Sequence, residues 1–214
     1  NLLWCHDLAM GRQRNTFNGV LWNVDQVMTV SRFMADQYQE VYGLPEELFW
    51  VTRNGIDLAE VARAAEPVPL PGAEFASGMP IVRDRKKLLY CARPERGLDV
   101  LLESIFPTLL EKDPHLVLYL AGYDNTVPEM APFYRHIDQR IAALGDRVVW
   151  LGSLTKADLY RHYATAALYV YPTPSPTSAA FAEVSCISAM EAMAAGTPIV
   201  TSRRGALPET IAPE

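Results

Sequence analysis

Two glutamates separated by seven residues, Glu183 and Glu191, have the spacing in this sequence that best fits a chemical role. Glu191 lies in an apolar stretch that predicts a helix over residues 186–195, which Gly196 would end in a left-handed conformation. Glu183 precedes this helix, near its positive end. The first backbone N–H groups of a helix, here at residues 186–188, have no partner inside it and attract anions. The stretch therefore suits a ligand with a diphosphate and several hydroxyl groups.

The segments around this helix predict that it belongs to a parallel sheet. The apolar run 167–171 is typical of a buried strand, the Pro/Ser/Thr-rich residues 172–178 of a loop, and residues 197–201 of a further strand. Strand, loop, helix and strand in this order place the loop and the start of the helix at the carboxyl edge of a sheet.

The same helix should bury one of its faces. Ile187, Met190 and Ala194 have helical spacing, and we expect them to pack on the sheet. Glu191 would then flank this face rather than point freely into water. Taken alone, the two glutamates favour a plainer interpretation, in which one belongs to an acidic turn before a helix and the other to a helix surface.

A second charged segment follows another predicted strand. Arg93 and Arg96 lie just after the strand expected over residues 87–91 and just before a helix. Two guanidinium groups at the carboxyl end of a strand are well placed to bind a diphosphate. As an isolated peptide, the segment would instead be a solvated loop with charges.

Several of these segments resemble a known family. Glu-x7-Glu followed by Ala-Met-Ala-Ala-Gly-Thr-Pro-Ile-Val is similar to the donor-site signature of retaining glycosyltransferases of family 4, the glycosyl transferases group 1. The run Val-Asp-Gln-Val-Met-Thr-Val-Ser at residues 24–31 and Asn-Gly-Ile-Asp at residues 54–57 also stand where this family has signatures. The resemblance spans nearly the whole chain and is densest over residues 147–211. It implies the α/β GT-B fold, with Rossmann-like domains and parallel sheets.

The resemblance also implies roles for individual residues. Glu183 would hold sugar hydroxyls, Glu191 the ribose, and Arg96 and Arg93 the donor phosphates, although Arg96 replaces the usual lysine in a shorter segment. His6 matches a histidine that faces the donor sugar. The loop over residues 152–154 stands where the family binds the base. The expected catalytic residues are Glu183, His6 and Arg96, and the expected donor-binding residues are Arg93, Arg96, Glu183, Cys186, Ile187, Ser188, Glu191, Gly152 and Leu154.

Composition restricts the class of protein. Half of the 214 residues are hydrophobic, 21% are charged and the net charge is −6, which argues against nucleic acid as the main partner. Three widely spaced cysteines indicate reduced thiols in a cytoplasmic protein, and no run approaches the ~20 apolar residues of a membrane span. Asn1 leads directly into an expected strand, so we expect a piece of a longer protein that lacks most of the N-terminal acceptor domain. That missing part would also provide any peripheral membrane contact.

The remaining pattern alternates strands and helices, as parallel sheets require. The N-terminal part predicts strands over residues 2–5, 26–30 and 48–52, a polar loop over 12–18, and a helix over 32–42 capped by Ser31 and closed by Gly43. The later part predicts strands over 87–91, 115–121 and 147–151, and helices over 98–112 (kinked at Pro107), 129–144 (ended by Gly145) and 157–164 (begun by a Thr155–Asp158 capping box). We therefore expect the second half of the N-terminal domain at 1–65, a linker or surface loop at 66–80, and the donor-binding domain at 81–214.

The resemblance implies transfer of a sugar from a nucleotide diphosphate sugar to a glycan, lipid or protein acceptor, with retention of configuration. No Asp-x-Asp motif is present, which agrees with a metal-independent site without a cofactor, and no Gly-x-Gly-x-x-Gly or P-loop motif occurs. The family glycines are absent around Val184-Ser185-Cys186. Because such glycines let backbone approach phosphate, their absence favours one alternative, a non-catalytic nucleotide- or sugar-binding partner protein. A sugar-nucleotide epimerase of the same fold is a second alternative.

Overall fold

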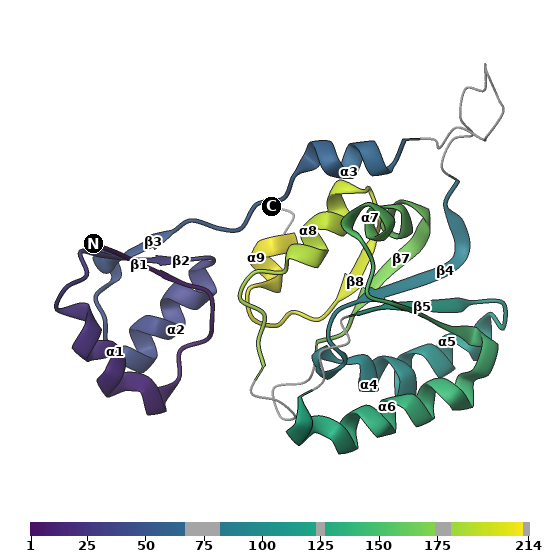
Figure 1. Cartoon of the computed structure of the whole chain (residues 1–214), viewed down its shortest axis with the longest axis horizontal. Helices are drawn as coiled ribbons and strands as arrows, with labels where there is room; N and C mark the ends of the chain where they lie inside the picture. Colours follow the sequence, from purple (N-terminus) through teal and green to yellow (C-terminus); the bar gives the residue numbers. More distant parts are fainter. Residues whose placement is uncertain (67–81, 123–126, 174–180, 212–214) are drawn as a thin grey trace. The chain divides into compact units, whose positions relative to one another are not determined.

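The computed structural model describes residues 1–66, 82–122, 127–173 and 181–211 (Figure 1). Their contacts form two compact units. The first is drawn from Asn1–Ile56, Ala179–Ile187 and Arg203–Glu214, and the second from Asp57–Ser178 and Ser188–Ser202. Residues 67–80 of the expected linker lie outside the described residues. The domain boundaries expected from the sequence therefore stay a prediction, and each unit is described by itself.

The first unit is built on a parallel sheet with the strand order β1-β2-β3. Its elements are β1 (Leu2–Cys5), α1 (Arg14–Leu21), β2 (Gln26–Thr29), α2 (Arg32–Tyr42), β3 (Phe49–Val51) and, near the C-terminus, α9 (Leu207–Ile211). Side chains from the strands, from α2 and from the connection between β2 and α2 form the buried core, namely Cys5, Val27, Val30, Met34, Tyr38 and Tyr42. The three strands and α2 confirm the sequence prediction to within one or two residues.

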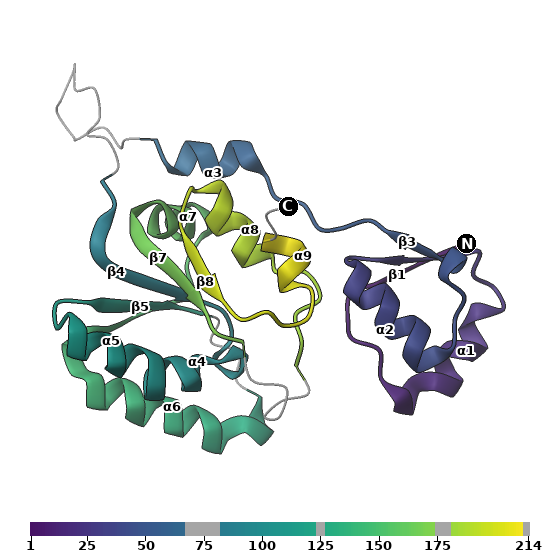
Figure 2. The same cartoon turned by 180° about the vertical axis from the view of Figure 1, so that it is seen from behind.

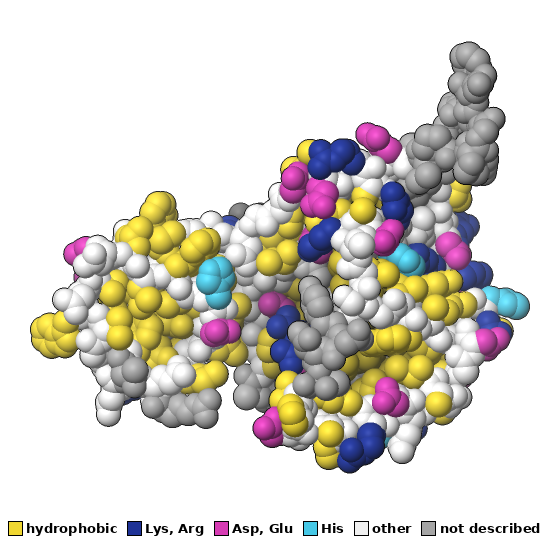
Figure 3. Space-filling view, in the orientation of Figure 1, with side chains coloured by type: hydrophobic (Ala, Val, Ile, Leu, Met, Phe, Trp, Pro, Cys, Tyr) yellow, Lys and Arg dark blue, Asp and Glu magenta, His cyan; other side chains and the backbone are white. Residues whose placement is uncertain are grey.

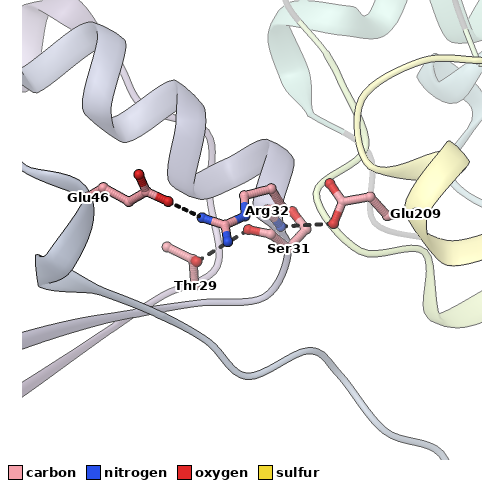
Figure 4. A network of polar contacts seen from close by, with 5 residues as sticks. All are labelled: Thr29, Ser31, Arg32, Glu46 and Glu209. Atoms are coloured by element: carbon pink, nitrogen blue, oxygen red, sulfur yellow. Dashed lines mark hydrogen bonds and ion pairs between the residues drawn. The ribbon is translucent and has the colours of Figure 1, made fainter.

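Both ends of α2 are set by local signals. The Ser31 side chain accepts a hydrogen bond from the Met34 N–H (3.1 Å), and Gly43 ends the helix with φ of 72°. The α2 N-terminus also has a distant partner, because Glu209 of α9 accepts hydrogen bonds from the backbone N–H groups of Arg32 (2.8 Å) and Phe33 (2.6 Å) (Figure 4). A carboxylate is favourable at this positive helix end. Glu209 therefore fastens α9 to α2 within the first unit.

The prediction of a polar loop over residues 12–18 is wrong. The chain forms a 3-10 turn over Gly11–Gln13 and then α1. Phe17 stacks on Tyr42 with 4.4 Å between ring centroids and meets the edge of Tyr38 at 5.3 Å. Phe17 and Leu21 pack against the core of this unit and hold a helix whose other residues are mostly polar.

One face of the three-stranded sheet carries large apolar side chains that are exposed. Trp4, Met28 and Trp50 are paired across the three strands in one row, and Trp4 and Trp50 are 55% and 53% exposed. Figure 3 shows hydrophobic side chains at the surface of this unit. The sheet therefore buries only the side chains of its other face, which pack against α1 and α2.

The second unit is a five-stranded parallel sheet with the order β6-β5-β4-β7-β8. Its strands are β4 (Asp84–Cys91), β5 (Val117–Ala121), β6 (Val148–Gly152), β7 (Ala166–Tyr171) and β8 (Ile199–Thr201). One face is covered by α4 (Leu98–Val100), α5 (Phe106–Lys112) and α6 (Ala131–Leu144), and the other by α7 (Lys156–Thr165) and α8 (Ile187–Ala194), with α3 (Leu58–Ala64) packed on α7 (Figures 1 and 2). The predicted strands and helices of this part are confirmed, with ends displaced by one to three residues.

Two details of this unit differ from the sequence pattern. The helix predicted over 98–112 is continuous but widens into a π-helical turn at Leu101–Ile105, because Pro107 has no N–H and its ring displaces the preceding turn. Helix α3, which the sequence analysis missed, begins at Asp57, whose side chain accepts hydrogen bonds from the N–H groups of Ala59 (2.9 Å) and Glu60 (3.0 Å). It contacts α7.

A buried lysine lies on the second sheet. Lys87 is 7% exposed, donates to Thr165 Oγ1 (2.6 Å) and lies 5.0 Å from the Tyr119 ring centroid. Burial lowers the pKa of Lys87 to about 8, partly offset by the charge of Asp84. Since an unfolded lysine titrates near ~10.4, the unfolded chain binds more protons between these values, and the contribution of Lys87 to stability rises with pH across that interval.

Lys87→Met is therefore expected to stabilise the fold at pH 7, by roughly 1–3 kcal/mol, and to lose this advantage as the pH approaches ~10.4. Chemical denaturation of the variant and the parent protein across this pH range measures the difference. Lys86→Met, at an exposed neighbouring lysine, is the matched control and should show no such trend. A Lys87→Met protein that is less stable at pH 7 would show that burial of the charge carries no cost here.

Candidate functional site

Glu191 lies on α8 and is only 3% exposed. Its Oε1 accepts a hydrogen bond from the Tyr160 hydroxyl (3.2 Å) and forms an ion pair with Lys156 Nζ. Both partners come from α7. A buried carboxylate is costly unless it is hydrogen-bonded and paired, and these two groups meet that requirement.

The buried face of α8 differs from the expected one. Ala189 and Ala192 are fully buried, whereas Ile187 is 42% exposed and Ala194 is also exposed. The small alanines let α8 pack closely, and Glu191 turns inward because α7 supplies its polar partners. The expectation that Ile187, Met190 and Ala194 form the packed face is therefore wrong, and Glu191 belongs to the buried side.

The first turn of α8 contacts the second sheet. The hydroxyl of Tyr169, within β7, lies 2.9 Å from Ser188 Oγ and 3.2 Å from the carbonyl oxygen of Cys91, the last residue of β4. Tyr169 itself is fully buried. This contact fixes Ser188 at the carboxyl edge of the sheet, where backbone N–H groups of the helix begin.

The arginine segment lies at the same edge. Residues Pro94–Arg96 form a 3-10 turn directly after β4, and Gly97 follows with φ of 99°. A Cβ atom at Gly97 would lie 1.6 Å from the Pro172 carbonyl oxygen, so only glycine permits this approach to the end of β7. Arg93 Nε lies 2.6 Å from Glu95 Oε1 but is not aligned to donate a hydrogen bond to it. Half-buried Arg96 follows in the same turn.

We expect Arg96→Ala to weaken binding of a nucleoside diphosphate by ~1.5–3 kcal/mol, the range for hydrogen bonds to charged groups, and to affect the free nucleoside far less. Titration calorimetry with both ligands measures this difference. Arg85→Ala removes an exposed arginine near the other end of β4 and serves as the control for loss of positive charge. Equal losses for the nucleoside and its diphosphate would mean that Arg96 does not contact the phosphates.

The predicted base-binding loop connects β6 to α7. Gly152 has φ of 68°, and its carbonyl oxygen accepts a hydrogen bond from the Gly122 N–H (3.1 Å). Leu154 is half-buried. Thr155 then caps α7, since its Oγ1 accepts from the Asp158 N–H (3.2 Å) and lies 2.6 Å from Asp158 Oδ2. The capping interaction confirms the predicted start of this helix and places Lys156 in its first turn.

Glu183 belongs to the first unit and is 4% exposed. Its carbonyl oxygen accepts a hydrogen bond from the Ala206 N–H (2.7 Å). Gly205 has φ of 59°, and a Cβ atom there would lie 2.3 Å from that same oxygen. Arg204 Nε also donates to the Phe181 carbonyl (2.8 Å). The backbone around Glu183 is therefore fixed by residues 204–206.

The predicted site residues are divided between the two units. Arg93, Arg96, Gly152, Leu154, Ser188 and Glu191 belong to the second unit. Glu183, Cys186, Ile187 and His6 belong to the first. Cys186 is buried, and exposed His6 follows β1 with its ring centroid 4.7 Å from that of Trp4. The roles of all these residues stay predictions.

Sequence reasoning missed Lys156 and Tyr160. They are four residues apart on a helix that the sequence did predict, so they share one face. That spacing was the available signal, but nothing in it indicates which residue the pair contacts. Among the described residues, no group of three or more His, Cys, Asp or Glu side chains is arranged to hold a metal ion, and no helix has the length and apolarity of a membrane span.

The family model of the glycosyl transferases group 1 matches residues 85–214, and the chain belongs to this family. It is 28% identical over 191 residues to an uncharacterized glycosyltransferase of Methanocaldococcus jannaschii, covering 87% of this chain and 44% of the relative. It is 25% identical over 193 residues to the lipopolysaccharide 1,2-N-acetylglucosaminetransferase of Salmonella typhimurium, covering 88% and 47%. The chain thus spans about half the length of these curated relatives.

Solved structures agree on the fold. An Anabaena protein crystallised with UDP and glucose superposes with a TM-score of 0.71 at 17% identity, covering 97% of this chain and 54% of that one. The same protein has also been crystallised with UDP-glucose, and that structure gives a TM-score of 0.69 at 18% identity, with the same coverage. At this identity the likeness establishes the fold alone: α/β with parallel, Rossmann-like sheets of the GT-B type.

Proposed function

We propose that the protein transfers a sugar from a nucleotide diphosphate sugar to an acceptor with retention of configuration. The observation that carries this proposal is the burial of both signature glutamates, Glu183 and Glu191, at 4% and 3% exposure in a member of this family. Glutamate is almost never fully buried without a specific partner. Lys156 and Tyr160 pair Glu191, so both buried glutamates are held in place, which suits residues that bind a ligand better than the surface of a solvated helix.

In the proposed mechanism the protein works by orientation and by stabilising charge. Arg96, with Arg93, and the backbone N–H groups of Cys186, Ile187 and Ser188 would hold the departing diphosphate. The leaving phosphate would help to remove the acceptor proton on the same face of the sugar, so no protein nucleophile is required. Glu183 and His6 would contact the sugar, and Glu191 the ribose.

The donor class is supported by what similar proteins bind. The Anabaena protein of the same fold was crystallised with UDP-glucose, and this chain carries the guanidinium groups and the helix start that suit a diphosphate. A nucleotide sugar is therefore the proposed donor. The acceptor belongs to the activity of the complete protein and is proposed only as a glycan, lipid or protein hydroxyl.

Product analysis separates this function from its two alternatives. The complete protein would be incubated with a panel of nucleotide sugars and candidate acceptors, and the products resolved by mass spectrometry and NMR. A glycosylated acceptor and a released nucleoside diphosphate are expected. An inverted sugar centre on an intact donor would indicate an epimerase. Saturable binding without turnover would support a partner protein, which the residues Val184-Ser185-Cys186 favour because they replace the family glycines.

Nucleotide binding is expected to survive removal of divalent cations. Arg93 and Arg96 follow β4 at the carboxyl edge of the second sheet, and two guanidinium groups would neutralise a diphosphate without a metal ion. Calorimetric titration of a nucleoside diphosphate with and without EDTA should give the same Kd. A Kd that rises strongly in EDTA and returns with added Mg²⁺ would contradict the metal-independent site.

A further inference from the structure

We propose that Lys156 and Tyr160 are positioning residues for Glu191, and that they set how strongly the protein prefers a ribonucleoside diphosphate over its deoxyribose form. This inference rests on the proposed function, in which Glu191 holds the ribose. The structure adds two residues of another helix, α7, that fix the Glu191 carboxylate.

The geometry of the three side chains supports this role. Both the Tyr160 hydroxyl (3.2 Å) and Lys156 Nζ contact the same oxygen of Glu191, Oε1, so Oε2 carries neither contact. The Lys156 ammonium also lies 5.7 Å from the Tyr160 ring centroid. The Lys156 side chain is 52% exposed while that of Glu191 is 4% exposed, so the lysine approaches the buried carboxylate from the solvent side.

This arrangement has a chemical consequence. An ionised carboxylate can accept hydrogen bonds but cannot donate them. Because its two oxygens belong to one planar group, contacts that fix Oε1 also fix the direction of Oε2. The ammonium compensates the buried negative charge, and the phenol hydrogen bond limits rotation of the carboxylate. Oε2 can then accept a hydrogen bond from a hydroxyl group of the ligand in a preset direction. A ribose offers two neighbouring hydroxyls, and a deoxyribose lacks one of them.

Calorimetry on the complete protein tests this with defined probes. The tightest ligand among UDP, GDP, ADP and CDP would be compared with its 2′-deoxy and 3′-deoxy forms. The parent protein should bind the ribose form about 10-fold more tightly than at least one deoxy form, as expected for a hydrogen bond to a charged group. Lys156→Met and Tyr160→Phe should each weaken the ribose form by about 3- to 10-fold, leave that deoxy form nearly unchanged, and so reduce the preference.

Two further variants separate positioning from folding. Lys156→Arg keeps the charge and should restore most of the preference. Arg161→Met removes an exposed cation of the same helix, which pairs with Asp158 at 3.0 Å, and should leave all Kd values unchanged. In steady-state kinetics, Lys156→Met should raise the donor KM with little change in kcat, because uniform binding is lost.

The outcomes distinguish this inference from the proposed function. If the parent protein binds none of the diphosphates, the proposed function and this inference are both overturned. If the parent protein prefers ribose and the Lys156 and Tyr160 variants keep the same preference, only the positioning role is overturned. Equal weakening of ribose and deoxyribose forms would also overturn it, since a general structural defect acts on both.

Discussion

Replacing Glu183 with glutamine should lower kcat by ~10²-fold or more, the loss expected if the carboxylate supplies the ~2.7–4 kcal/mol typical of one preorganised electrostatic group. Glu183 is buried, and its backbone is fixed by the Ala206 N–H at 2.7 Å. Its proposed hydrogen bonds to sugar hydroxyls should strengthen as the sugar gains positive character in the transition state. Steady-state kinetics on the complete protein with its donor measures the change.

Glu191→Gln is the matched control for this experiment. Its proposed contacts lie on the nucleoside, where they change little during the reaction, so the variant should mainly raise the donor KM. The two substitutions have the same size and the same loss of charge. If Glu183→Gln keeps the parent kcat, the pair of glutamates is structural, and the partner-protein alternative gains support.

Gly205→Ala is expected to destabilise the first unit by about 2–5 kcal/mol, because a left-handed conformation and a backbone clash add together. The φ of Gly205 is 59°, and a Cβ atom would lie 2.3 Å from the Glu183 carbonyl oxygen and 2.7 Å from its nitrogen. Relief of the clash must move the backbone of Glu183. We therefore expect kcat to fall as well in whatever fraction of the variant stays folded.

Gly43→Ala provides the comparison, since Gly43 has a φ of 72° but meets only the end of the Arg14 side chain, at 3.4 Å. This substitution should lower the free energy of unfolding only by the ~1–2 kcal/mol of the left-handed conformation, and it should leave kcat unchanged. Chemical denaturation and kinetics on both variants measure the difference. A Gly205→Ala protein as stable and active as Gly43→Ala would contradict the proposed coupling between Gly205 and Glu183.

The local parts of the fold could be predicted from the sequence. Helix α2 begins after Ser31 and ends before Gly43, and α7 begins after Thr155. Gly196 follows α8 with φ of 70°. Each of these signals acts within a few residues of the helix end. The alternation of apolar strands with helices was sufficient to predict two parallel sheets. These features depend on hydrogen bonds and periodicity that a short window of sequence contains.

The parts that escaped prediction depend on distant contacts. Phe17 packs α1 against α2, although most residues of α1 are polar. Glu191 is paired on its buried side by Tyr160 and on its solvent side by Lys156, which are 31 and 35 positions away in sequence. Glu209 reaches the N-terminus of α2 from 177 positions away. Periodicity places such residues on a helix face but does not identify the partner they meet there.

The anomeric configuration of the product is the most direct test of the central claim. The complete protein would transfer sugar from an α-linked nucleotide donor, and NMR would determine the configuration of the new linkage. A retaining glycosyltransferase gives an α-linked product. A β-linked product would contradict the retaining mechanism assigned to Glu183 and the departing diphosphate.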